Sequence, residues 1–421
     1  MLETIVLLFA LAGLVLYTVL GGADFGAGLW QLLSGPGPRG RAVRDHAHHA
    51  MAPVWEANHV WLIFVLTVTW TAFPVVVGSL ASTLTVPISV AALGIVFRGL
   101  AYALQSATDV PHERRVIDTT FAVSSVLTPY MLGAAVGAIA SGRVPVGNAA
   151  GDLIGSWVNP TSILTGCLAV AVGAFLAAVY LAADARRLGE AGLERAFRVR
   201  ALATGMLTGA LAVAGLAVLH HDARHIYDGL TSGYGLAAVI VSAAAGTATL
   251  VLVWASRFQL ARVSAALAVA AVLAGWAAAQ RPDVLPGLTL HQAAAGRATL
   301  IAVIVAVLAG GVILAPSLGL LLRLMLTGGF DPGSRPARKS PGSPTSARSG
   351  ARPGTSARLA VACLLAGFVL LTVVDAGVAH VFGVLALLAA AALTFAAVTP
   401  GDLPEDDQQP AATRSRSVRS G

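Results

Sequence analysis

Nine apolar segments, each close to the ~20 residues that an α-helix needs to cross a bilayer, dominate the first 325 residues of this 421-residue chain. They are predicted at 4–30, 53–80, 82–106, 118–141, 160–183, 200–220, 232–256, 260–279 and 298–325. Only 11% of the residues are charged, against about 25% in soluble domains. Because a helix satisfies its own backbone hydrogen bonds in lipid, we predict an all-α polytopic membrane protein with about nine core transmembrane helices, arranged as two four-helix bundles plus one helix.

The sequence changes character after this membrane domain, which we place at 1–327. Residues 328–357 are rich in Pro, Ser, Arg and Gly, a composition typical of a disordered linker. Residues 358–399 are apolar and would make a single helix ~60 Å long at 1.5 Å per residue. Since that exceeds one bilayer, a C-terminal transmembrane hairpin is predicted, followed by a disordered polar tail at 400–421.

Basic residues are distributed unequally between the connections on the two sides of the membrane. One set of connections carries clusters of arginine, as in the segments 39–44 and 186–200, whereas the opposite connections carry single arginines such as Arg143 and Arg224. Cytoplasmic loops collect Lys and Arg, so the N-terminus is expected outside and the clusters inside. The net charge of +7 is thereby explained by membrane topology, and no nucleic-acid partner is expected.

The cysteine, histidine and catalytic sequence motifs predict no catalytic or metal site. Cys167 and Cys363 lie in apolar segments, so a disulfide or a CxxC metal site is not expected. The histidine-rich segments 45–49 and 220–225 are interpreted as solvated loops rather than metal sites. No phosphate-binding loop, CxxCH haem attachment or Ser–His–Asp arrangement is present.

The second segment, Met51–Pro74, carries polar residues where the chain enters the membrane. Glu56 would lie ~7 Å deep, five residues at 1.5 Å each, where a charge costs ~2.5–3.5 kcal/mol or more. Glu56 and His59 are three residues apart and share a helix face. Two interpretations stay open: a cytoplasmic proton relay, or a snorkelling acid between the interfacial Trp55 and Trp61.

Two further charged residues fall in the cytoplasmic half of neighbouring helices. Asp24 lies in LGGADFGAG, whose glycines permit a close approach of another helix. Arg98 lies near the end of the third segment, and it either pairs with Glu56 or Asp24 or anchors the helix at the interface. His59 is a possible haem or metal ligand, but a helical histidine is more often simply hydrogen-bonded.

These motifs, in this order, resemble one known family, subunit II of the bd-type quinol oxidases. GGADFGAG is similar to the family's GFD-x-G segment, APVWEANHVWLI to its P-x-W-(D/E)-x-N-x-V-W-L-I block, and FRG at 97–99 to its F-R-P. The resemblance extends from the N-terminus to about residue 326. The sequence departs from the family pattern at Gly21, Ala57 and Gly99.

The resemblance implies a function for the whole assembly. The chain would be a haem-free subunit, inactive alone, in the plasma (inner) membrane of a bacterium. It would pair with a haem-bearing subunit I, in which b-type and d-type haems oxidise quinol and reduce dioxygen to water, and small accessory subunits could join them. No catalytic residue, cofactor site or metal site is expected in this chain itself.

The resemblance also assigns roles to individual residues. Glu56 and Asp24 become candidates for a proton path from the cytoplasm, with Trp55, Asn58, Trp61 and Arg98 as supporting residues. Two other classes of function stay open beside it. The same intramembrane acids suit a proton-coupled secondary transporter, although no matching pair of broken helices is evident, and a purely structural membrane scaffold would use neither acid.

Overall fold

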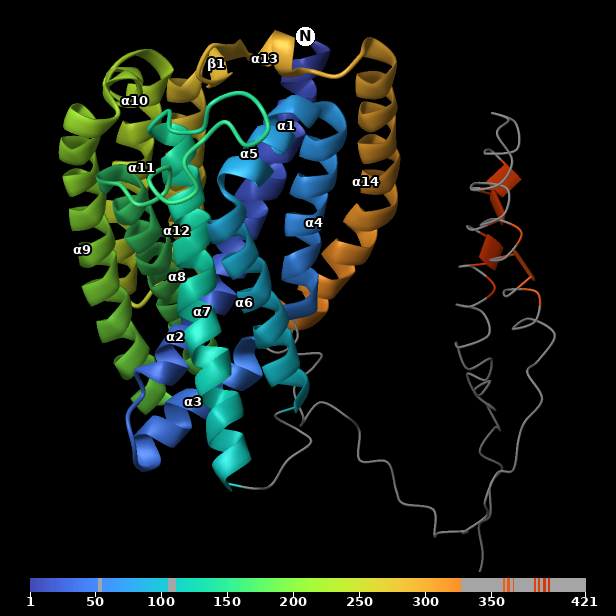
Figure 1. Cartoon of the computed structure of the whole chain (residues 1–421). Coiled ribbons are helices and arrows are strands. Elements are labelled where there is room, and N and C mark those ends of the chain that lie inside the picture. The colour runs from blue at the N-terminus through green and yellow to red at the C-terminus, as the bar shows by residue number, and fades with distance from the viewer. Residues whose placement is uncertain are drawn as a thin grey trace, which may run out of the picture. The chain divides into compact units, whose positions relative to one another are not determined.

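The computed structural model describes residues 1–51, 55–104 and 111–326, together with single positions between 359 and 393. Among the described residues the protein is almost entirely helical (Figure 1). The elements are α1 (Leu2–Leu16), the π-helical turn η1 (Tyr17–Gly21), α2 (Gly22–Leu32), α3 (Pro38–Met51), α4 (Trp55–Ala72), α5 (Pro74–Thr83), α6 (Thr85–Leu104), α7 (Pro111–Ala140), α8 (Pro160–Arg187), α9 (Ala191–Asp222), α10 (Arg224–Leu230), α11 (Gly233–Trp254), α12 (Phe258–Gln280), β1 (Asp283–Leu285), β2 (Leu288–Thr289), α13 (Leu290–Ala293) and α14 (Arg297–Leu326).

The long helices confirm a multi-pass membrane protein. Within the described residues, seven helices are long and apolar enough to cross a bilayer, or up to eight if the bent pair α4–α5 forms one span. Within α14, the apolar helix Arg297–Val312 is shorter than the ~20 residues of a full span. The predicted number of nine is therefore not confirmed.

The second predicted span, 53–80, is wrong as a single straight helix. It is divided into α4 and α5, and the helix axis bends by 117° between them. Pro74 explains the break, because proline has no N–H to donate and disfavours helical geometry in the residue before it. Phe73 accordingly adopts φ −136° and ψ 59°. The Ala72 carbonyl at the break accepts a hydrogen bond of 2.7 Å from the backbone N–H of Ala295.

The first span runs from Leu2 to Leu32 without a break, but its winding changes in the middle. Tyr17–Gly21 form a π-helical turn between α1 and α2. Such turns insert one extra residue into an α-helix and are frequent at functional sites. Here the turn ends three residues before Asp24.

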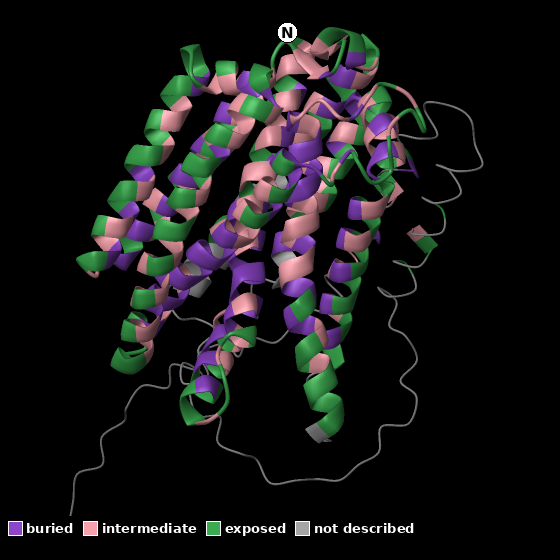
Figure 2. Ribbon diagram, turned by 60° about the vertical axis from the view of Figure 1, so that its left-hand side comes forward, coloured by how far each residue is buried: buried purple, intermediate pink, exposed green. Residues whose placement is uncertain are grey.

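The core lies around α8, which packs against α9, α7, α2 and α12. Its buried residues include Phe175, Leu176 and Leu181, and they contact Trp30 of α2 and Phe197 of α9 in one apolar cluster. Figure 2 shows buried residues on the inward helix faces and exposed residues on the outer faces. Further along the chain α11 packs on α12, while α14 contacts α1 and α4. The grouping into two four-helix bundles plus one helix stays a prediction.

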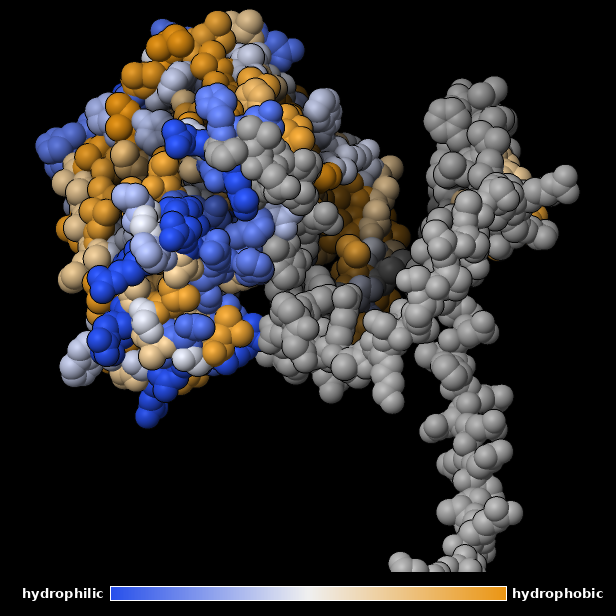
Figure 3. Space-filling view, turned by 90° about the horizontal axis from the view of Figure 1, so that it is seen from below, coloured by the Kyte–Doolittle hydropathy of each residue, from blue (hydrophilic) through white to orange (hydrophobic). Residues whose placement is uncertain are grey.

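Short elements lie at the two ends of the helices (Figure 1). Helix α3 packs against α2 and α8 at one end, and Figure 3 shows hydrophilic residues gathered on the face at this end. The β1–β2 hairpin and the single-turn α13 lie at the other end, where a bidentate ion pair of 2.6 and 3.0 Å joins Arg143 to Asp222. Asp222 also accepts hydrogen bonds from the backbone and side chain of Thr161, so α7, α8 and α9 are tied together there.

A second unit comprises Arg335–Gly421. Its described positions, between 359 and 393, are helical. The predicted linker (328–357) and tail (400–421) lie outside the described residues, as does most of the predicted hairpin (358–399). The domain boundaries proposed for them stay predictions.

Candidate functional site

Asp24 and Arg98 form a buried ion pair between two of the membrane helices. Asp24 lies on α2 and Arg98 on α6, and their side chains are 2% and 1% exposed. Arg98 Nη2 is 2.6 Å from Asp24 Oδ1 and also donates to the Asp24 backbone carbonyl at 3.0 Å. Of the two acids between which the sequence could not choose, the structure pairs Arg98 with Asp24.

Helix α7 completes the surroundings of the guanidinium group. Arg98 Nη1 donates a hydrogen bond to Ser125 Oγ, and Ser125 in turn donates to the Phe121 carbonyl at 2.6 Å. The Arg98 Cζ atom lies 4.2 Å from the centre of the Phe121 ring and 4.9 Å from that of Phe25. A buried charge needs a counter-charge and hydrogen bonds, and aromatic faces attract a cation further.

Glycine makes room for this arrangement. A Cβ atom on Gly28 would overlap Ser125 Oγ and would lie 2.9 Å from Arg98 Nη1. On the opposite side of α2, a Cβ on Gly26 would collide with the Gly173 carbonyl of α8. The glycines that follow Asp24 therefore let α7 and α8 approach α2 closely, as the LGGADFGAG pattern predicts, and they leave room for the Arg98 side chain of α6.

Several polar atoms in this region have no hydrogen-bond partner among the described residues. They are Asp24 Oδ2, Arg98 Nε and the Tyr17 hydroxyl in the π-helical turn. A buried polar group without a partner costs about 1–3 kcal/mol, and such groups call for a functional or solvent-based explanation. Asp24 thus uses one oxygen for Arg98, while the other has no partner among the described residues.

The start of α4 packs onto the π-helical turn. Asn58 is buried, and its Nδ2 donates a hydrogen bond of 3.2 Å to the Leu20 carbonyl. The His59 ring makes edge-on contacts with Tyr17 and Phe25, with centroids 6.4 and 6.2 Å apart. His59 therefore belongs to the aromatic surroundings of the Asp24–Arg98 pair.

Of the other residues predicted for the site, only Trp61 has a described side chain. Trp61 is half-buried, with its ring 6.2 Å from that of Phe64, and is not part of the ion-pair cluster. The side chains of Glu56 and Trp55 lie outside the described residues. Glu56 is on α4, two residues before Asn58, so its backbone is ~3 Å along the helix axis from a residue that contacts the first span.

The histidine-rich segments are not loops, contrary to the sequence-based expectation. Residues 45–49 belong to α3, and 220–225 span the end of α9 and the start of α10. His46 is buried with its Nε2 3.1 Å from the Leu181 carbonyl and 4.0 Å from an Asp184 carboxylate oxygen. In the part of the chain that the structure describes, no three His, Cys, Asp or Glu side chains gather as a metal site.

Four residues of the site were not predicted from the sequence: Tyr17, Phe25, Ser125 and Phe121. Ser124 and Ser125 form a polar pair in the membrane-spanning part of α7, which is a usable signal because hydroxyls inside a membrane helix often contact another helix. Tyr17 offers no comparable signal, since its place depends on the π-helical turn.

Comparison with known proteins decides the family. The family model for cytochrome bd terminal oxidase subunit II matches residues 2–325. The chain belongs to this family. As a cytochrome bd subunit II, it is a component of a quinol oxidase complex whose other principal component is subunit I.

Individual proteins similar to this chain are also bd oxidase subunits or structures. "Putative cytochrome bd menaquinol oxidase subunit II" of Bacillus subtilis (strain 168) is 24% identical over 237 residues, 55% of this chain and 67% of the relative. "Cytochrome bd ubiquinol oxidase subunit 2" of the same strain is 28% identical over 114 residues, which is 27% of this chain and a third of the relative. A chain of the bd oxidase from Geobacillus thermodenitrificans matches with a TM-score of 0.61 and 25% identity, over 77% of this chain and 99% of that one.

Proposed function

We propose that this cytochrome bd subunit II conducts protons from the cytoplasm toward the oxygen-reducing site of subunit I, through Glu56 and Asp24. The observation that carries the proposal is the buried Asp24–Arg98 pair, in which one carboxylate oxygen has no partner among the described residues. Ionisable residues inside membrane segments are costly and commonly mark proton relays.

The two acids have different tasks in this proposal. Asp24 is held by Arg98, so its charge is fixed in place, and its second oxygen is available to orient a water molecule. Glu56 takes up the proton near the cytoplasmic end and releases it inward. Asn58 supports this arrangement, because it fixes the start of α4 against the Leu20 carbonyl of the first span.

The haems are assigned to subunit I, and this chain carries neither a haem nor a catalytic residue. The substrate of the complex is a quinol. The relatives are named for menaquinol in one case and ubiquinol in the other, so the proposal extends to the quinol class only.

One structural feature would suit the alternative, a proton-coupled transporter. Transporters use broken helices, and the α4–α5 pair is bent by 117°. Transporters of this kind show such breaks in corresponding positions of two halves, whereas the described residues contain one bent pair. The oxidase function is therefore better supported.

The substitution Glu56→Gln tests the proton path in the assembled complex. Removing a group that transfers protons typically slows a reaction by about 100-fold or more, so we expect quinol-driven oxygen consumption to fall by that order. The haem difference spectrum and the subunit ratio should stay unchanged, because the substitution keeps the size of the side chain.

A matched control is Glu190→Gln, which alters an exposed acid at the start of α9. This variant should consume oxygen at the wild-type rate. Normal respiration by an assembled Glu56→Gln complex would show that the proton path does not pass through this residue, although membership of the family would stand.

A further inference from the structure

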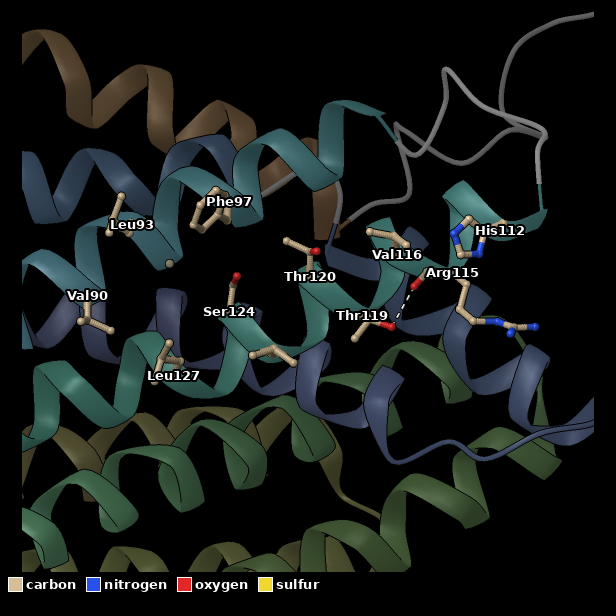
Figure 4. A pocket seen from close by; sticks show the side chains of 12 residues that line it. Val90, Leu93, Phe97, His112, Arg115, Val116, Thr119, Thr120, Ser124 and Leu127 are labelled. Atoms are coloured by element: carbon tan, nitrogen blue, oxygen red, sulfur yellow. Dashed lines mark hydrogen bonds between the residues drawn. The ribbon is translucent and has the colours of Figure 1, made fainter.

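A groove of about 600 Å³ lies between α6 and α7, apart from the Asp24–Arg98 pair (Figure 4). Its walls are mainly apolar and follow one face of each helix. The residues that form these walls include Val90, Leu93 and Phe97 on α6 and Val116, Val123 and Leu127 on α7. Leu93 and Val123 are about half exposed, so the groove opens onto the surface that faces lipid or a neighbouring subunit.

Basic residues lie at one end of the groove. Figure 4 shows His112 and Arg115 together at the end where α7 begins, beyond Val116 and Thr119. Arg115 is exposed, and its guanidinium forms no hydrogen bond or ion pair with a described residue. The acids of this helical segment, Glu113 and Asp118, are not among the residues that line the groove. The groove is therefore mainly apolar along its length, with the hydroxyls of Thr119, Thr120 and Ser124 on one wall, and positively charged at one end.

The dimensions of the groove fit one leaflet of a bilayer. Leu127 follows Arg115 by twelve residues, which corresponds to ~18 Å of helix. Half of the hydrocarbon core is ~15 Å thick. A molecule whose charged group lies at Arg115 can therefore extend its apolar part along the groove to the middle of the bilayer.

We propose that this groove binds an anionic phospholipid, with its phosphate beside Arg115 and His112 and one acyl chain along Leu93, Phe97 and Val123. Arginine suits phosphate because its planar guanidinium donates several hydrogen bonds. A quinone fits the charge pattern less well, since its head group is neutral. The site is independent of the proton path, so either proposal can fail without the other.

Native mass spectrometry of the purified, delipidated complex tests the site. The complex is titrated with phosphatidylglycerol or phosphatidylcholine in a neutral detergent. We expect one phosphatidylglycerol molecule to bind more tightly than phosphatidylcholine, and Arg115→Gln to weaken that binding roughly fivefold, the factor that one basic residue contributes near anionic lipid. Arg114→Gln is the matched control, because the adjacent Arg114 is exposed but does not line the groove.

A second variant tests the apolar part of the groove. Val123→Trp fills the space while it leaves both basic residues in place, so it should also abolish the tightly bound phosphatidylglycerol. The proposal is overturned by equal binding of the two lipids. It is overturned equally if Arg115→Gln has no effect or if Arg114→Gln has the same effect.

Photo-crosslinking identifies the occupant in the native membrane. With the photoreactive residue p-benzoylphenylalanine in place of Leu93, the expected product is an adduct of this chain with phospholipid. An adduct with subunit I would assign the groove to the subunit interface instead, and an adduct with quinone would assign it to quinone binding. Either result would overturn the lipid proposal.

Discussion

Arg98 is a permanently charged residue that the fold removes almost completely from solvent. Its charge is compensated by one oxygen of Asp24, by two further hydrogen bonds and by two aromatic faces. Breaking a buried pair by removing one partner leaves an uncompensated charge, which is far more costly than removing both partners. Variants that remove one partner or both partners therefore distinguish a structural role of the ion pair from a role in proton transfer.

Asp24→Asn should therefore lower the stability of the complex by about 3–5 kcal/mol. The double variant Asp24→Asn with Arg98→Gln should recover much of that loss, since no charge then stays buried. Thermal unfolding of the detergent-purified complex measures both effects. If the double variant is no more stable than Asp24→Asn alone, the ion pair is not what stabilises this region.

Oxygen consumption by the same two variants distinguishes the two roles. A proton path through Asp24 requires both variants to turn over slowly, whatever their stability. A purely structural pair predicts that the double variant respires almost normally.

At the scale of single helices, the glycines of α2 set its distance from α8. Gly26→Ala would place a methyl group against the Gly173 carbonyl and within 2.8 Å of the Ala177 Cβ atom. Overpacking of this kind typically costs about 1–3 kcal/mol. We expect a lower unfolding temperature and reduced assembly with subunit I.

Gly209→Ala provides the comparison, because nothing lies within 4 Å of a Cβ atom at this exposed position of α9. Both substitutions raise the helix propensity by about 1 kcal/mol, so the difference between them isolates the steric effect. Similar unfolding temperatures for the two variants would contradict the tight α2–α8 contact.

The sequence predicts these helices well, and predicts their interruptions poorly. Length and hydropathy locate most of the spans within a few residues, because the bilayer sets the required length. The bend at Phe73–Pro74 was not predicted, although Pro74 is visible in the sequence, since prolines are also tolerated within helices: Pro129 lies inside α7 and Pro316 inside α14. A proline can break a helix where another part of the fold provides hydrogen bonds for the backbone groups that the break leaves free. Here the backbone N–H of Ala295 donates a hydrogen bond to the Ala72 carbonyl.

For the candidate site, the sequence predicts the charges but not their contacts. Asp24 and Arg98 are conspicuous as charged residues in apolar helices, yet the choice between Asp24 and Glu56 as the partner of Arg98 depends on how three helices pack. Ser125 and Tyr17 depend on the same packing. Local sequence cannot supply that information.

At the scale of the whole molecule, the distribution of arginine predicts the orientation. Helix α3 contains Arg39, Arg41 and Arg44, whereas the connection 141–159 at the other end contains only Arg143. From the positive-inside rule we therefore predict that α3 lies in the cytoplasm and the N-terminus outside. This orientation follows from charge alone and does not depend on the proton path.

Cysteine labelling measures this orientation. In a background where Cys167 and Cys363 are replaced by alanine, Arg41→Cys and Ala150→Cys introduce single thiols at exposed positions. A membrane-impermeant maleimide should label Ala150→Cys in intact cells and Arg41→Cys only after permeabilisation. The reverse pattern would invert the orientation and would place the proposed proton entry on the wrong side.

The π-helical turn rotates the side chains of α2 about the helix axis, relative to the positions that an uninterrupted α-helix continuing α1 would give them. Each residue of an α-helix turns the chain by about 100°, and a π turn accommodates one extra residue. The halves on either side of Tyr17–Gly21 are thus offset by about one residue's rotation. The α1 half packs on α4 and α14, whereas the α2 half packs on α7 and α8. One continuous helix thereby serves two sets of neighbours, and Asp24 lies on the half that packs against α7 and α8.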